Sequence, residues 1–231
     1  MIPLADDIPS RRFPVITYLI IAANVLAFFF ELSLGRYLDR FIAIFGLVPW
    51  RIVNWSSYPA VFITIFTSMF LHAGWVHLFG NMLYLWVFGD NVEDAMGHMR
   101  FLIFYIVSGC VAALAQVLVN PLSKVPMIGA SGAVAGVLGA YFLFYPRARV
   151  IMAVPFLFYL QLISVPAILV LGGWFLIQLL NGFATITAAT AVTGGIAWWA
   201  HVGGFVTGLV LGPILRKSHS EDYYDDYEDY L

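Results

Sequence analysis

Residues 126–140 read PMIGASGAVAGVLGA, an apolar stretch in which Ser131 stands among glycines and alanines. Gly132 and Gly136 are four residues apart, so on a helix they form a face of small residues that a second helix can approach closely. A serine in a membrane helix usually bonds a backbone carbonyl of the preceding turn, which is the simplest role for Ser131. A second segment rich in small residues, Ala-His-Val-Gly-Gly at 200–204, contains a histidine. If the two segments meet, Ser131 has a chemical role as an alternative to this structural one.

The composition is that of an integral membrane protein. Of the 231 residues, 62% are hydrophobic and 10% are charged, and the mean hydropathy is +0.90, whereas a soluble domain is about 25% charged. Six of the thirteen carboxylates follow Ser220, and the remaining chain has eleven basic and seven acidic residues, a net charge of +4. We therefore expect the lipid bilayer as the surroundings of the chain, and no nucleic-acid partner.

The apolar runs predict an all-α membrane domain at residues 13–217 with six spanning helices, because each span needs about 20 apolar residues. The spans are expected at residues 13–30, 74–88, 99–119, 131–145, 165–180 and 195–215. Mixed aromatic, aliphatic and basic residues at 33–67 are typical of a segment that lies in the membrane interface. The acidic, tyrosine-rich residues 218–231 are expected to form a disordered tail.

Two connections between spans are predicted from polar or small residues. Gly89-Asp90-Asn91 is expected to end the second span, and a short polar loop with Glu93 and Gly97 is expected to follow it. Residues 182–194, mostly alanine and threonine, are expected to join the last two spans. The stretch from 150 to 164 is left unassigned because Pro155 interrupts it.

The distribution of basic residues predicts the orientation. Seven lie on the side of the N-terminal segment 1–12 and four on the other side, so the positive-inside rule favours both termini in the cytoplasm. The chain is thus predicted to be a multi-pass protein of the cell membrane, with residues 1–12 and the tail 218–231 in the cytoplasm.

This topology predicts four polar residues at a similar depth in the outer leaflet. The fourth span begins at the outer face with Ser131, and His201 lies six residues past Gly195, roughly 9 Å into the sixth span. His77 and Asn81 lie near the outer end of the second span, four residues apart and therefore on one face. Ionisable side chains at such a depth are functional candidates because their burial in a bilayer is costly.

The glycines of the last span predict that these residues meet. Gly204 and Gly208 are four residues apart, as are Gly132 and Gly136, so the two faces can pack closely and bring the serine hydroxyl within reach of His201. Gly212 continues the same spacing.

The resulting group has the chemistry of a serine hydrolase. An imidazole that takes the proton of an adjacent hydroxyl activates it as a nucleophile. Asn81, His77 and the free N–H at the start of the fourth span can donate hydrogen bonds to an oxyanion. Since no carboxylate lies in the last three spans, we expect a Ser131–His201 dyad rather than a triad, with no cofactor.

Metal and transport chemistry are weaker alternatives. His72 and His77 are five residues apart and lack the glutamate of a His-Glu-x-x-His motif, so no metal site is predicted. A proton path through His72, His77 and His201 would indicate a transporter, but we expect no acidic residue within a span to partner them.

Taken together, these motifs resemble those of the rhomboids, a family of intramembrane serine proteases. The matching residues are Phe70-Leu71-His72, His77-Leu78, Asn81-Met82-Leu83, Gly89 with Glu93 and Gly97, Gly129-Ala130-Ser131-Gly132, and Ala200-His201 with Gly204 and Gly208. The resemblance implies a six-span bundle with a membrane-embedded first outer loop, and a protease that cuts transmembrane-helix substrates. The implied site residues are Ser131 as nucleophile, His201 as general base and acid, His77 and Asn81 in the oxyanion hole, and Gly129 and Gly132 next to the substrate.

One position departs from the family pattern. Members often have an aromatic residue four positions after the serine, stacked on the histidine, whereas this chain has Ala135. We expect Trp198 or Trp199 to take its place. The resemblance also allows a non-catalytic relative that binds membrane clients, but such relatives typically lack the serine or the histidine, and this chain has both.

Overall fold

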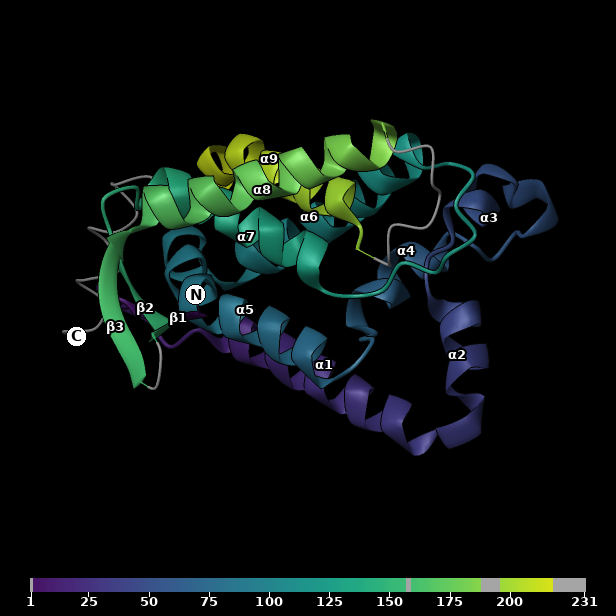
Figure 1. Ribbon diagram of the computed structural model, residues 1–231, viewed down its shortest axis with the longest axis horizontal. Helices are drawn as coiled ribbons and strands as arrows, with labels where there is room; N and C mark the ends of the chain where they lie inside the picture. Colours follow the sequence, from purple (N-terminus) through teal and green to yellow (C-terminus); the bar gives the residue numbers. More distant parts are fainter. Residues whose placement is uncertain (1, 157–158, 188–195, 218–231) are drawn as a thin grey trace, which may run out of the picture.

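The computed structural model describes residues 2–156, 159–187 and 196–217, and most of them are helical (Figure 1). The helices and 3-10 turns (η) are α1 (Val15–Ser33), η1 (Gly35–Tyr37), α2 (Leu38–Phe45), α3 (Pro49–Val53), η2 (Trp55–Ser57), α4 (Ile63–Thr67), η3 (Ser68–Phe70), α5 (Trp75–Met96), α6 (His98–Val119), α7 (Ser131–Phe144), α8 (Ala167–Thr187) and α9 (Trp198–Leu215). The strands are β1 (Ile2–Asp6), β2 (Arg149–Phe156) and β3 (Tyr159–Pro166).

Helix α7 lies in the middle of the bundle and contacts α5, α6, α8 and α9 (Figure 1). Every residue from Gly132 to Tyr141 is buried. Because most of these residues are glycine or alanine, the backbones of neighbouring helices can come close on several sides at once. The sequence therefore places the segment that begins at Ser131 at the core of the protein.

Four helices, α1, α6, α8 and α9, are long and apolar enough to cross a membrane. Helix α5 passes the same test only together with the preceding segment Ile63–Phe70, from which it is bent by 93°. Helix α7 has 14 residues, about 21 Å of rise. The described chain thus has four or five spans by length and composition, and the predicted number of six includes α7, which is shorter than a usual span.

The expectation of an all-α fold is wrong in one respect, because the chain also forms a small antiparallel sheet in the order β1-β2-β3. Ile2 is paired with Ala153 and Arg149 with Pro166, so the sheet includes the stretch that the sequence left unassigned. Valine and isoleucine side chains favour strands, and here this preference outweighs the tendency of Pro155 to interrupt regular structure. The sheet lies at one end of the molecule, opposite helices α2 and α3 (Figure 1).

The sheet is attached to the central helix by Asp6. Its carboxylate accepts a hydrogen bond from the Tyr141 hydroxyl of α7 at 2.5 Å. Burial raises the pKa of Asp6 to about 6. Next to it, the Asp7 carboxylate accepts the backbone N–H of Arg149 at 2.7 Å, which fixes β1 against the start of β2.

The polar loop predicted after the second span is instead helical, because α5 continues to Met96. Glu93, with 1% of its surface exposed, accepts hydrogen bonds at the start of α1 from the N–H groups of Ile16 and Thr17 and from the Thr17 hydroxyl, at 2.7–2.9 Å. The first N–H groups of a helix lack partners within it, and a carboxylate stabilises them strongly. Glu31 likewise lies inside α1, so the expectation of no acidic residue within a span is also wrong.

Helix α8 differs from the predicted fifth span at both ends. It begins at Ala167, after β3, and continues to Thr187, so the first part of the predicted loop 182–194 is helical. Asn181 and Thr185 donate to backbone carbonyls of the preceding turn, which accommodates these polar side chains within a helix. The rest of that loop and the predicted tail lie outside the described residues.

Candidate active site

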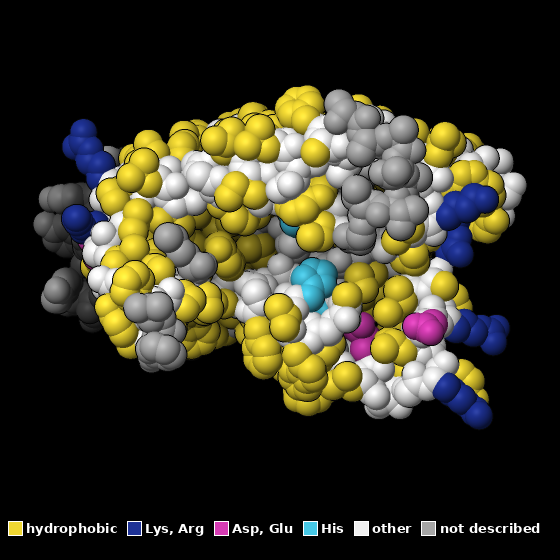
Figure 2. Space-filling view, viewed as in Figure 1, with side chains coloured by type: hydrophobic (Ala, Val, Ile, Leu, Met, Phe, Trp, Pro, Cys, Tyr) yellow, Lys and Arg dark blue, Asp and Glu magenta, His cyan; other side chains and the backbone are white. Residues whose placement is uncertain are grey.

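A cavity of about 910 Å³ lies between α5, α7, α8 and the first turn of α9. The space-filling view shows the molecule hollowed in this region, with histidine side chains at its edge (Figure 2). Its lining is mostly apolar, but it includes the polar side chains of His77, Asn81, Ser131 and His201. The cavity therefore contains all four polar residues that the sequence predicts at one depth.

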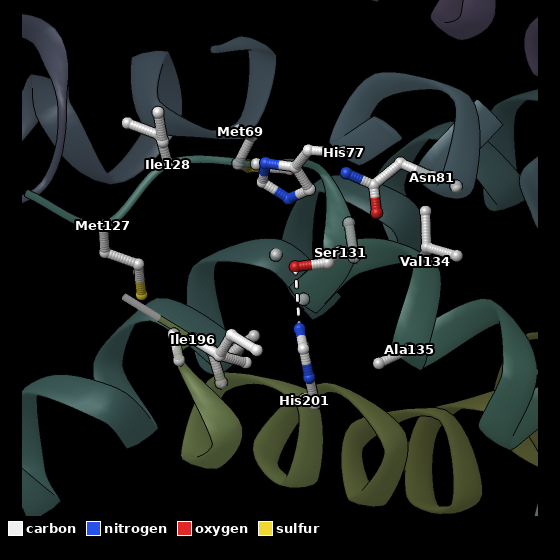
Figure 3. A pocket seen from close by; sticks show the side chains of 18 of the residues that line it. Met69, His77, Asn81, Met127, Ile128, Ser131, Val134, Ala135, Ile196 and His201 are labelled. Carbon is white, nitrogen blue, oxygen red and sulfur yellow. Dashed lines mark hydrogen bonds between the residues drawn. The ribbon is translucent and has the colours of Figure 1, made fainter. Parts of the chain in front are cut away.

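Ser131 and His201 form a hydrogen bond inside this cavity, with 2.9 Å between the Ser131 Oγ and the His201 Nε2 (Figure 3). The contact depends on the predicted glycine interface, which is confirmed. A Cβ atom at Gly204 would lie 2.0 Å from the Gly132 carbonyl oxygen, and one at Gly208 would lie 2.0 Å from that of Gly136. Only glycine leaves room for this approach of α7 and α9.

Gln116 of α6 fixes the start of α9. Its Oε1 accepts the backbone N–H groups of Trp199 and Ala200 at 3.1 and 3.3 Å, and the residue before α9 supplies no side-chain cap of its own. Since unpaired N–H groups at a buried helix start are costly, this contact sets the position of the first turn. His201 follows Ala200 directly in the sequence, so its position depends on this contact.

The other ring nitrogen of His201 is bound to Gln178, a residue that the sequence analysis missed. Its Oε1 lies 2.8 Å from the His201 Nδ1, and its Nε2 donates to the Trp174 carbonyl at 3.2 Å. Gln178 is 95% buried in α8. The lack of carboxylates in the last three spans favours a dyad, but the amide of Gln178 in the middle of an apolar span is a signal that His201 has a neutral partner.

Aromatic support for His201 comes from two tryptophans. The Trp174 ring lies 5.7 Å from the imidazole at 39°, and the Trp198 ring lies 6.3 Å away at 88°. Trp199, the other expected candidate, instead donates to the Gly182 carbonyl. Ala135 is buried beside the site and supplies no ring. Trp174 of α8 provides part of the aromatic surface that would otherwise come from this position.

His77 and Asn81 lie on the side of Ser131 opposite to His201 (Figure 3). The Ala73 N–H donates to the His77 Nδ1 at 3.4 Å, so the proton of a neutral imidazole is on Nε2, where it can be donated into the cavity. The Asn81 Nδ2 is buried and has no hydrogen-bond partner among the described residues. Both side chains therefore offer free donors beside the serine.

The two candidate substrate-binding glycines border the cavity but contact different neighbours. Gly129 has a φ of +125°, and a Cβ there would lie 2.6 Å from the His77 Cε1, so glycine makes room for that ring. A Cβ at Gly132 would instead lie 2.6 Å from the Ala112 Cβ of α6. The chain before Gly129 is held by the paired backbones of Leu47 and Met127.

Comparison with known proteins gives one consistent family. A family model described as the Rhomboid domain matches residues 59–218. The chain is 30% identical over 191 residues to Rhomboid protein 1, mitochondrial, of Saccharomyces cerevisiae, which is 77% of this chain and 51% of that protein. It is 34% identical over 128 residues to Rhomboid protease GluP of Bacillus subtilis, 55% of this chain and 24% of the relative.

A plant relative extends the comparison. Rhomboid-like protein 11, chloroplastic, of Arabidopsis thaliana is 35% identical over 115 residues, 49% of this chain and 40% of that protein. The chain thus spans between about a quarter and a half of the length of these three relatives.

Proposed function

Because the chain belongs to the rhomboid family, we propose that it is an intramembrane serine endopeptidase that uses a Ser131–His201 dyad. The observation that carries this proposal is the hydrogen bond between the serine hydroxyl and the imidazole within the cavity. The free donors of His77 and Asn81 beside the serine support the same chemistry.

In the proposed reaction, His201 Nε2 takes the Ser131 proton while the Ser131 Oγ attacks the carbonyl carbon of a peptide bond. The Ser131 backbone N–H, the Asn81 amide and the His77 imidazole donate to the oxyanion. His201 then gives its proton to the leaving amine as the C–N bond breaks, which leaves an acyl-enzyme. Water attacks the acyl carbon, again with His201 as base, and releases the acid product and the serine.

The proposed substrates are transmembrane helices of membrane proteins, cut near the outer leaflet. The cavity is bordered by α5 on one side and by Trp174 of α8 on another. Most of its lining is apolar, which suits the apolar side chains of a transmembrane substrate. A helical substrate has to unwind locally, because the carbonyls of an intact helix are hydrogen-bonded and shielded. Gly129 and Gly132 are then next to the exposed strand of substrate.

The proposed topology is that of a multi-pass cell-membrane protein with six spans in residues 13–217, including α5 and α7. Residues 1–12 and 218–231 are cytoplasmic, and the helices between α1 and α5 form a first loop embedded in the outer leaflet. Exposed aromatic side chains on that loop, such as Trp55 and Phe62, support its contact with lipid.

Labelling with a fluorophosphonate, which reacts with activated serines, tests the proposal without knowledge of the substrate. We expect the purified wild type to be labelled and Ser131→Ala to be unlabelled. Ser33→Ala is the matched control, because that exposed hydroxyl donates only to the Phe30 carbonyl. An unlabelled wild type that is folded would contradict the proposal and favour the client-binding alternative.

Asn81→Ala is expected to lower the turnover of substrate by about 100-fold or less, since oxyanion donors share the stabilisation of the developing charge. The measurement is kcat on a reconstituted substrate, with thermal unfolding as a check of folding. Complete inactivity of a normally folded variant would argue that Asn81 has a structural role instead.

A further inference from the structure

The histidine of the proposed dyad is held from both sides. Ser131 contacts its Nε2 from α7, while Gln178 contacts its Nδ1 from α8. Helix α8 is in turn packed on α9 by the stacked rings of Phe175 and Phe205, whose centroids are 4.4 Å apart. The imidazole is thus placed by three helices.

The hydrogen bonds of Gln178 determine its orientation and that of the proton on the imidazole. The Trp174 carbonyl can only accept, so the amide nitrogen of Gln178 must face it. The amide oxygen therefore faces His201 Nδ1, which must carry the hydrogen. In the neutral imidazole this leaves an unprotonated Nε2 directed at the serine hydroxyl, the form that a general base needs.

An amide suits this position because of its surroundings. The described residues of α8 and α9 include no carboxylate or cation, and the titratable groups that line the cavity beside His201 are His77 and Tyr84 of α5. A buried unpaired carboxylate would be costly in a bilayer, whereas an amide supplies an acceptor without charge. A neutral amide also serves as third member in Cys-His-Asn proteases.

We infer that Gln178 is a positioning residue that holds His201 in the tautomer and orientation required for proton transfer from Ser131. This inference rests on the proposed function. It also makes the site dependent on α8, since the acceptor is lost whenever α8 separates from α9. The competence of the dyad is therefore coupled to the packed position of this helix.

The first test compares three full-length variants in cleavage of a reconstituted transmembrane substrate. Gln178→Met keeps the length of the side chain but removes the acceptor, and we expect kcat to fall about 10- to 100-fold with KM unchanged. Gln178→Glu keeps an acceptor oxygen and is expected to regain part of the lost kcat. Asn181→Met is the control, because Asn181 also donates to a carbonyl four residues earlier, whereas the hydrogen bonds of His201 among the described residues go to Gln178 and Ser131.

The second test is independent of activity. The Nδ1–H of a hydrogen-bonded histidine gives a downfield proton resonance, which is assigned here by its loss in His201→Ala. We expect it in wild type, Ser131→Ala and Asn181→Met, and not in Gln178→Met. Absence of the resonance from wild type, its persistence in Gln178→Met, or equal kcat for Gln178→Met and wild type would overturn the inference. A wild type that shows the resonance but cleaves nothing would contradict the proposed function alone.

Discussion

Ser131→Ala and His201→Ala are each expected to lower cleavage of a membrane-embedded substrate about a millionfold, to the background rate. The first change removes the nucleophile, and the second removes the imidazole that, among the described residues, is placed 2.9 Å away to take its proton. Because the two side chains act as one unit, the double variant should lose no more activity than either single variant. The measurement is the initial rate of product formation in proteoliposomes that hold a substrate with one transmembrane segment.

Folding is checked separately for these variants. The hydrogen bonds that these changes remove are only partly buried and border a cavity, so we expect thermal unfolding close to that of wild type. Thr207→Ala is a matched control on α9, since its hydroxyl donates only to the Gly203 carbonyl of the same helix. Cleavage by both site variants at the wild-type rate would refute the assignment of the dyad.

Gly208→Ala is expected to cause a large loss of stability, because a Cβ there would lie 2.0 Å from the carbonyl oxygen of Gly136 and 2.8 Å from the Ala140 nitrogen. No side-chain rotation relieves a clash with backbone, so α7 and α9 have to separate. Overpacking of a core usually costs about 1–3 kcal/mol, and we expect the upper end of this range or more. The separation also moves His201 away from Ser131, so fluorophosphonate labelling should be lost together with stability.

Two other glycines make this prediction quantitative. A Cβ at Gly212 would lie 3.1 Å from the Ala140 Cβ, and one at Gly173 of α8 would meet nothing within 4 Å. The midpoint of thermal unfolding in detergent should therefore fall most in Gly208→Ala, less in Gly212→Ala, and hardly at all in Gly173→Ala. Equal midpoints for all three variants would show that the interface of α7 and α9 is looser than described.

The sequence predicted the centre of this protein better than its edges. Spacings of four are local patterns with one geometric meaning. Between glycines they placed Ser131 and His201 together, and between His77 and Asn81 they placed both side chains on one face of a helix. Gln178 was missed because its role depends on a neighbour 23 residues away on another helix. The predicted end of the second span at Gly89-Asp90-Asn91 was wrong, because polar residues such as Glu93 suggested a loop. The contacts of Glu93 with the start of α1, which stabilise it inside the helix, depend on a distant part of the chain.

The pairing of β1 with β2 has a consequence for biosynthesis. Ile2 leaves the ribosome well before its partner Ala153, which is made about 150 residues later. Long-range pairing of this kind is slow, because the intervening chain must first be ordered. Helices α1 to α7 therefore have to be synthesised before the sheet can close, and β1 must wait on the same side of the membrane as β2. Closure of the sheet, with Asp6 on Tyr141, becomes a late step that ties the beginning of the chain to the helix that begins with Ser131.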